Sequence, residues 1–125
     1  IDAVLDRLRS EKRRMAVATG TSRPGLDRGL VSSRLGPYFE FTRCANETAS
    51  KPDPLMLRQI LEATGVSASR AVMVGDTIYD MEMARRLGMP AIGVTWGVHS
   101  MDQLGEHGPV EIVSDRPALE RVLLP

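Results

Sequence analysis

Short, uninterrupted apolar runs separated by helix-patterned segments constrain the fold of this chain more than any other feature. The runs at 15–19, 71–75 and 91–95 are typical of strands buried on both faces of a sheet. Less apolar runs at 39–44 and 111–113 are expected as further strands. The alternation with helices predicts a parallel, twisted sheet covered on both faces, a three-layer α/β/α Rossmann-like fold. The helices are expected at 26–35, 55–65, 78–87 and 117–124.

Length and charge exclude several classes of protein. The 125 residues are expected to form one domain, 1–125, with 42% apolar and 26% charged residues. Sixteen basic residues balance sixteen acidic ones, so nothing favours a nucleic-acid or anionic-membrane partner. The basic run at 12–14 is interpreted as the solvated end of a helix.

The sequence also favours a cytoplasmic protein. No apolar stretch approaches the roughly 20 residues that span a bilayer. Cys44 is the single cysteine, which excludes an internal disulfide and fits a reducing compartment.

Polar residues lie at the ends of two of the apolar runs and within the loop at 46–54. Thr19 ends the first expected strand and Gly20 follows it, while Lys51 lies just before a helix. Asp76 and Asp80 follow the strand at 71–75, and residues four apart share one face of a helix. Since ligands bind beyond the carboxyl ends of parallel strands, we expect these side chains to converge at one edge of the sheet.

The chemistry of these residues is complementary. Two carboxylates, Asp76 and Asp80, suit Mg²⁺, which prefers oxygen ligands and binds substrate phosphates. The Thr19 hydroxyl and the Gly20 N–H can bind an anion, and Lys51 supplies a positive charge for a phosphate. Together they predict a phosphoryl-transfer site, where positioning and charge neutralisation dominate catalysis.

Each residue alone also has a structural interpretation. Thr19 is common at a strand end, and Lys51 before proline is an ordinary loop residue. Asp76 could cap the following helix, and Asp80 could be a solvated helix residue. Trp96 and His99 follow the strand at 91–95 and could flank the same site; neither is expected to be catalytic.

The combination of Thr19, Ser50-Lys51-Pro52 and Gly75-Asp76-Thr77-Ile78-Tyr79-Asp80 resembles the haloacid dehalogenase-like hydrolase superfamily. The phrases TGTSRPGLDR, SKPDPLML, VGDTIYDMEMA and GVTWGVH are similar to its phosphoglycolate-phosphatase-like branch. The resemblance implies that Thr19 and Gly20 bind the phosphoryl group, that Lys51 stabilises its charge, and that Asp76 and Asp80 hold Mg²⁺. It implies a phosphatase of small phosphate monoesters that forms an aspartyl-phosphate.

The family's nucleophile motif, Asp-x-Asp-x-Thr, is absent from these residues, because no two aspartates are separated by a single residue. The family's cap is absent too. We therefore expect the chain to be a fragment of a longer protein, a phosphatase, and we expect the fragment alone to be inactive. The resemblance places the missing strand between those at 15–19 and 71–75. Unpaired strand edges are costly, so three outcomes are expected. The two strands pair directly, or another chain supplies a strand through self-association, or the segment comes from a longer protein.

Two other functions stay open at this stage. A non-catalytic or degenerate relative is favoured by the absent nucleophile. A receiver-type signalling domain also combines acids, a hydroxyl and a lysine, but it carries its acids before the other two. A dinucleotide-binding domain is disfavoured because no Gly-x-Gly-x-x-Gly follows the first strand.

Overall fold

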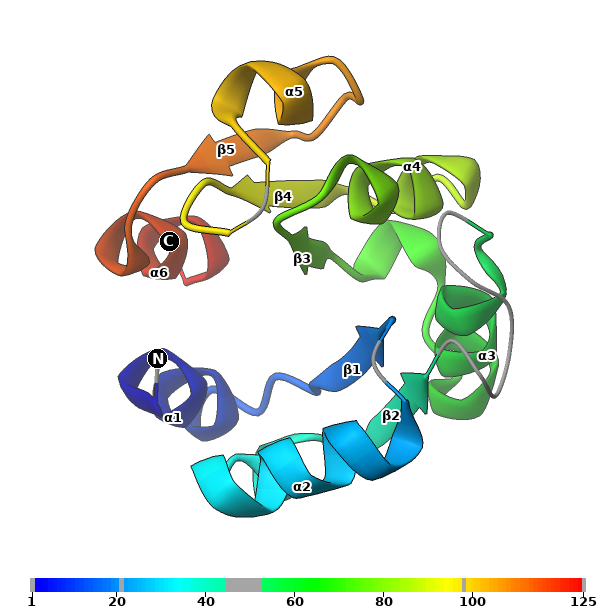
Figure 1. The fold of residues 1–125 in the computed structure, drawn as a ribbon, viewed down its shortest axis with the longest axis vertical. Helices are drawn as coiled ribbons and strands as arrows, with labels where there is room; N and C mark the ends of the chain where they lie inside the picture. The colour runs from blue at the N-terminus through cyan, green and yellow to red at the C-terminus, as the bar shows by residue number, and fades with distance from the viewer. Residues whose placement is uncertain (1, 21, 45–52, 98, 125) are drawn as a thin grey trace.

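The computed structural model describes residues 2–20, 22–44, 53–97 and 99–124, and in them helices and strands alternate as expected (Figure 1). The strands are short, and every strand is followed by a helix. The elements in chain order are α1 (Asp2–Ser10), β1 (Ala16–Thr19), α2 (Arg23–Ser33), η1 (Gly36–Tyr38), β2 (Phe41–Cys44), α3 (Leu55–Thr64), η3 (Ala68–Arg70), β3 (Met73–Gly75), α4 (Ile78–Arg86), β4 (Ala91–Val94), α5 (Met101–Gly105), β5 (Glu111–Val113) and α6 (Arg116–Leu123).

All strand pairs within the described residues are parallel, as predicted, but they form two sheets instead of one. β1 pairs with β2, with Thr19 opposite Cys44 at the end of the ladder. β4 lies between β3 and β5, and Gly75 is opposite Gly93. The five expected strands are therefore all present. In the described residues, no strand pairing joins β1 to β3.

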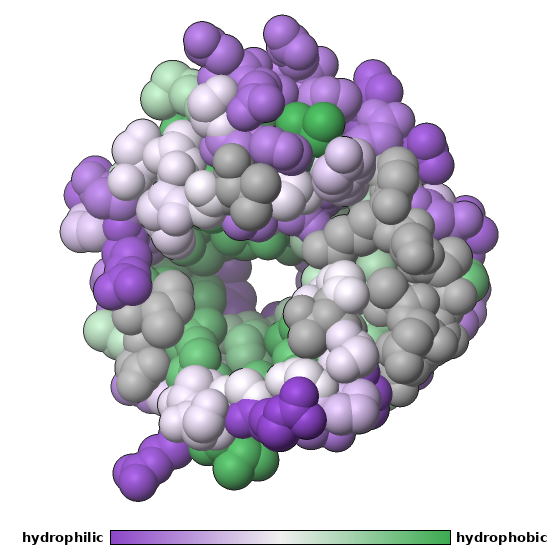
Figure 2. Space-filling model, viewed as in Figure 1, coloured by the Kyte–Doolittle hydropathy of each residue, from purple (hydrophilic) through white to green (hydrophobic). Residues whose placement is uncertain are grey.

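An opening separates the two sheets. Its volume is about 1010 Å³, and β1 and β3 lie on either side of it (Figure 1). Figure 2 shows that the opening passes through the molecule and that hydrophobic residues surround it. The expectation that β1 and β3 pair directly is therefore wrong, while occupation by another chain or by further polypeptide stays a prediction.

The hydrophobic core is divided between the two faces of the larger sheet. Strand β4 is buried along its whole length, and its alternate residues face opposite sides. Ala91 packs with α3, α4 and α5 in a cluster that contains the fully buried Met56, Met81 and Met83. Ile92 instead packs with Leu119 of α6. Methionine side chains adapt to irregular spaces, and these three fill the centre of that cluster.

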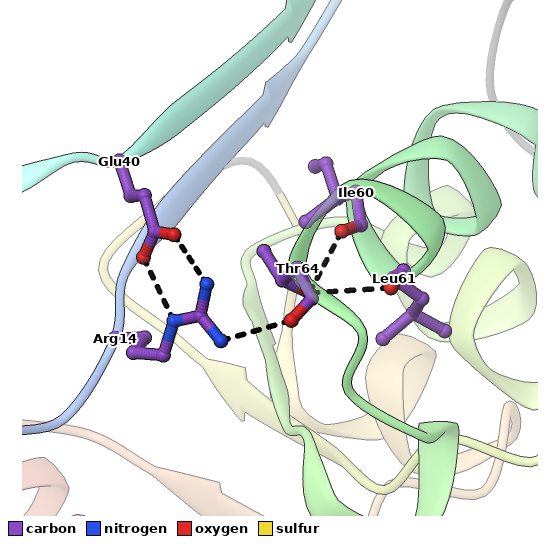
Figure 3. A network of polar contacts seen from close by, with 5 residues as sticks. All are labelled: Arg14, Glu40, Ile60, Leu61 and Thr64. Atoms are coloured by element: carbon purple, nitrogen blue, oxygen red, sulfur yellow. Dashed lines mark hydrogen bonds and ion pairs between the residues drawn. The ribbon is translucent and has the colours of Figure 1, made fainter.

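Arg14 links the smaller sheet to the rest of the molecule (Figure 3). Its Nε donates to Oε2 of Glu40 at 2.9 Å, and its Nη2 forms an ion pair with the same carboxylate. Its Nη1 donates to the carbonyl oxygen of Thr64, at the end of α3, at 2.9 Å. On the other side of the opening, Arg7 of α1 forms an ion pair with Glu120 of α6.

Local signals account for the differences between expected and observed helix boundaries. α2 begins at Arg23 because the Ser22 hydroxyl accepts from the Gly25 N–H and Pro24 suits the first turn. α1 ends at Ser10, so the basic run at 12–14 follows the helix instead of ending it. In the described part of the chain, no helix has the length and apolar character needed to cross a membrane.

Candidate metal and phosphate site

The junction of β3 and α4 is organised by Thr77, which is the N-cap of the helix. Its Oγ1 accepts a hydrogen bond from the backbone N–H of Asp80 at 3.1 Å and donates to Oδ2 of the same residue at 3.0 Å. This arrangement satisfies one of the unpaired N–H groups at the start of α4. The interpretation of Asp76 as the cap of this helix is therefore wrong.

Asp80 is buried, with 3% of its surface exposed, and the interpretation of it as a solvated helix residue is wrong. Helical side chains point toward the N-terminus of their helix, which directs Asp80 back over the end of β3. There it lies against Gly75, where an added Cβ would be 2.4 Å from the Asp80 Cβ. Only glycine at position 75 leaves room for this carboxylate beside the strand.

The loop after β4 closes over the other acid of the pair. A Cβ added to Gly97 would lie 2.0 Å from Oδ2 of Asp76, so glycine permits the close approach. The backbone N–H of His99 donates to the carbonyl oxygen of Asp76 at 3.1 Å, and its Nδ1 accepts from the Ile78 N–H at 2.9 Å. His99 therefore flanks the acidic pair, as the sequence suggested, through contacts to the backbone.

The predicted phosphate-binding residues lie on the other side of the opening. Thr19 is half-buried at the end of β1, and Gly20 follows it at the surface. Asp76 follows β3, which belongs to the other sheet. Lys51, the third residue expected to bind phosphate, lies outside the described residues. The structure thus joins Asp76 and Asp80 at one strand end, and it places Thr19 and Gly20 at the end of a different strand.

Both acids lie near the end of β3, where Asp76 follows Gly75 in the chain and Asp80 packs against Gly75. No group of three or more His, Cys, Asp or Glu side chains in the described residues is arranged to hold a metal ion. Two carboxylates near a strand end still suit Mg²⁺, which commonly binds one or two protein carboxylates together with water and phosphate. The assignment of Asp76 and Asp80 as metal ligands stays a prediction.

Three residues of the site were not singled out from the sequence. Thr77 is a good N-cap by residue type, but Asp76 is too, and the chain alone does not say which of them caps. Gly75 and Gly97 are required by close approach to Asp80 and Asp76, which only tertiary packing reveals. The sequence signals for these close approaches were Gly75 at the end of one expected strand and Gly97 in the loop after the next strand.

Fold and site define the class of this protein: a parallel α/β protein with paired carboxylates where a strand ends and a helix begins. The sequence model of the family described as haloacid dehalogenase-like hydrolase matches residues 1–94. The chain belongs to this family. Membership sets aside the receiver-domain alternative and confirms the resemblance drawn from the motifs.

Two relatives of the chain carry the name phosphatase. It is 40% identical over 100 residues to "Probable phosphatase IndB" of Dickeya dadantii, an alignment that takes in 79% of this chain and 44% of that protein. It is 35% identical over 69 residues to the phosphoglycolate phosphatase of Rhodospirillum rubrum, over 55% of this chain and 28% of that one.

Solved structures share the arrangement of nearly the whole chain. The crystal structure of a predicted phosphatase from Clostridium acetobutylicum is 26% identical and superposes with a TM-score of 0.90. The match covers 99% of this chain and 58% of that one. The chain therefore spans about half the length of the relatives that it matches.

Proposed function

We propose that these residues are the metal- and phosphate-binding part of a Mg²⁺-dependent phosphatase that acts on small phosphate monoesters. The observation that carries the proposal is the construction around Asp76 and Asp80. Burial of a carboxylate is costly without hydrogen bonds, and the Thr77 hydroxyl donates one to the buried Asp80. Gly75 and Gly97 leave room for Asp80 and Asp76 respectively. The names of the relatives support phosphate-ester hydrolysis as the reaction.

The acidic pair fits a hard cation. Asp76 and Asp80 offer carboxylate oxygens, which Mg²⁺ prefers, and the N-terminus of α4 lies beside them. In the proposed enzyme these two residues would hold Mg²⁺. The bound ion would neutralise the charge that develops on the transferring phosphoryl group. The hydrogen bond from the His99 N–H to the Asp76 carbonyl oxygen ties the backbone of Asp76 to the segment that follows β4.

The remaining residues bind the phosphate. We assign the Thr19 hydroxyl and the Gly20 N–H to the phosphoryl oxygens, and Lys51 to the negative charge shared by phosphate and nucleophile. The nucleophilic aspartate, which would form an aspartyl-phosphate and then release it to water, is expected from a segment outside these 125 residues. This chain alone is then expected to bind but not to turn over substrate.

Cellular setting and substrate follow from the same proposal. We propose a cytoplasmic enzyme, supported by the buried Cys44 as the single cysteine of the sequence. Its substrate is a small phosphate ester, and neither nucleic acid nor membrane is proposed as a partner. Phosphoglycolate is one member of this substrate class, and a relative of this chain carries its name.

The test is a phosphatase assay on the longer protein that contains this chain, with p-nitrophenyl phosphate and phosphoglycolate, with and without Mg²⁺. Thr19→Ala, Lys51→Ala and Asp76→Asn are each expected to lower kcat by about 10²- to 10³-fold. Asp102→Asn, an exposed acid on α5, is the matched control and should keep full activity. Equal activity in Asp76→Asn and Asp102→Asn, or Mg²⁺-dependent turnover by the 125 residues alone, would contradict the proposal.

A further inference from the structure

We propose that His99 is a positioning residue of the metal site, which fixes Asp76 by joining the segment after β4 to the start of α4. The imidazole does this in one neutral form, with Nδ1 as an acceptor and the proton on Nε2. The proposal rests on the proposed function, because it concerns the residues that would hold Mg²⁺. It deepens that function by assigning to His99 the preference of the site for Mg²⁺ over Ca²⁺.

His99 makes two hydrogen bonds to the turn that carries Asp76. Its backbone N–H donates to the carbonyl oxygen of Asp76 at 3.1 Å, and its Nδ1 accepts from the backbone N–H of Ile78 at 2.9 Å. Asp76 precedes the N-cap Thr77, and Ile78 is the first residue of α4. The two bonds therefore lie on either side of the N-cap, and a single residue joins both ends of the turn.

The turn and the histidine follow neighbouring strands of one sheet. β3 pairs with β4, and Gly75 at the end of β3 is opposite Gly93. The segment after β4 also meets the side chain of Asp76, since a Cβ added to Gly97 would lie 2.0 Å from its Oδ2. The same segment thus contacts Asp76 at its carboxylate and at its backbone, so both parts of this acid are placed relative to β4.

The acceptor function of Nδ1 determines which nitrogen of the ring carries the proton. A nitrogen that accepts a hydrogen bond uses its lone pair for it, so neutral His99 carries its proton on Nε2. In this form the ring has no free lone pair with which to take a proton from a substrate or from water. The arrangement suits orientation of the site and not general-base catalysis.

A ring contact also orients the imidazole. The ring centroids of Tyr79 and His99 are 6.0 Å apart, and the ring planes are inclined at 59°. Aromatic rings prefer offset or edge-to-face arrangements with centroids about 4.5–7 Å apart, and this pair lies in that range. Tyr79 is the second residue of α4, so the contact is a further connection between His99 and the start of that helix.

A fixed position of Asp76 is more important for Mg²⁺ than for Ca²⁺. Mg²⁺ demands near-ideal octahedral geometry with ligands at about 2.0–2.1 Å, whereas Ca²⁺ accepts a variable number of ligands in flexible arrangements. Residues that orient metal ligands typically contribute about 10- to 100-fold in affinity or activity. Removal of the acceptor at position 99 should therefore lower the affinity for Mg²⁺ much more than the affinity for Ca²⁺.

The structural alternative is that His99 only caps α4. A cap contributes to stability, and its loss would not change the ratio of the affinities for the two ions. The side chains of asparagine and glutamine separate the two nitrogens of the ring. Asparagine can place Oδ1 where Nδ1 accepts, and glutamine can place an N–H where Nε2 donates without supplying that acceptor.

The first measurement uses the 125-residue chain without metal. Long-range ¹H–¹⁵N NMR spectra, at a pH where imidazole is neutral, should show His99 protonated at Nε2 alone. His107, the other histidine of the sequence, makes no side-chain hydrogen bond within the described residues and should show a mixture of both forms. Exchange of the Ile78 amide should be about two- to ten-fold faster in His99→Ala and His99→Gln, and unchanged in His99→Asn.

The second measurement titrates Mg²⁺ and Ca²⁺ into the same variants. His99→Ala and His99→Gln are expected to weaken Mg²⁺ binding by about ten-fold and Ca²⁺ binding by less than about three-fold. His99→Asn and the matched control His107→Ala should keep both affinities. Circular dichroism reports whether each variant is folded, and if His99→Ala is not, the comparison of His99→Asn with His99→Gln decides.

Three results would overturn the proposal. They are protonation of the His99 ring at Nδ1, an Ile78 amide that exchanges equally fast in all variants, and equal losses of Mg²⁺ and Ca²⁺ affinity in His99→Gln. If the unchanged chain bound no Mg²⁺, the metal site of the proposed function would fail, and the preference for Mg²⁺ with it. The measurements without metal would still decide whether His99 holds the turn, so the two failures are distinguishable.

Discussion

Gly97 approaches Asp76 so closely that a Cβ on the glycine would lie 2.0 Å from Oδ2 of the aspartate. The two residues are 21 positions apart in the sequence, and they meet at one end of the larger sheet. The contact joins the segment after β4 to Asp76, the acid that follows β3. The surroundings of the two acids therefore come from this segment as well as from α4, which carries Asp80.

Replacing Gly97 with alanine should displace either the loop or the Asp76 carboxylate. We expect Gly97→Ala to lower the free energy of unfolding by about 1–3 kcal/mol, the usual cost of forcing atoms into occupied space. Gly29→Ala is the control, since nothing lies within 4 Å of its added Cβ on α2. Alanine should stabilise that helix by about 0.5–1 kcal/mol. Urea unfolding measures both, and a stabilised Gly97→Ala would contradict the contact.

The Thr77 hydroxyl has two functions that substitution can separate. Thr77→Val should cost about 1–2 kcal/mol of stability through loss of the helix cap, and it should also weaken Mg²⁺ binding because Asp80 loses a hydrogen bond. Thr77→Ser restores the hydroxyl and should recover both. Ser100→Ala removes the corresponding cap of α5 and should lower stability alone. If the Thr77→Val variant bound Mg²⁺ as tightly as the unchanged chain, the hydroxyl would have no function in metal binding.

The methionine core predicts a large difference between two substitutions of the same type. Met83 of α4 has no exposed surface and lies in the core cluster with Met56 and Met81, so Met83→Ala should cost about 2–5 kcal/mol. Met101 on α5 is 52% exposed, and Met101→Ala should change stability by less than about 0.5 kcal/mol. Thermal unfolding compares the two. Similar losses would mean that the core does not lie where the structure has it.

The pair of Arg14 and Glu40 predicts a pH dependence. Hydrogen bonding from Arg14 lowers the pKa of Glu40 from its ordinary value of 4.5. A carboxyl with a lowered pKa stabilises the fold above its unfolded pKa, and this contribution is lost as the pH falls through the folded value. Glu40→Gln should therefore reduce the loss of stability below pH 4.5. Glu62→Gln, on the exposed side of α3, is the control, and an equal effect of both substitutions would exclude the pair as the cause.

Much of the fold was readable because the strands are apolar and short. The runs around Val17, Val74 and Ile92 had the predicted identity and nearly the predicted boundaries. Helix α5 was missed because five residues give too little periodicity, although Ser100 and Gln103 have the spacing of a capping box. The expected end of the loop at residue 54 agrees with the structure, in which α3 begins at Leu55.

The site was only partly readable, for a physical reason. Residue type and the spacing of four identified Asp76 and Asp80 as a candidate pair. The expectation that they share one helix face is wrong, because α4 begins at Ile78 and Asp76 precedes its N-cap, Thr77. Burial of Asp80 and the contact of Gly97 with Asp76 depend on how β3, α4 and the loop after β4 pack, and no local pattern encodes that. The separation of β1 from β3 belongs to the same category, since direct pairing was an equally consistent expectation.

The central claim is that Asp76 and Asp80 form a metal site that is incomplete without a further carboxylate. The most direct measurement is a Mg²⁺ titration of the 125 residues, followed by ¹H–¹⁵N NMR. We predict weak binding with shifts confined to residues 75–80 and the loop at 95–99, lost in Asp76→Asn and kept in Asp102→Asn. Shifts spread evenly over exposed acids, or a Kd below about 1 μM, equivalent to about −8.2 kcal/mol, would contradict the claim.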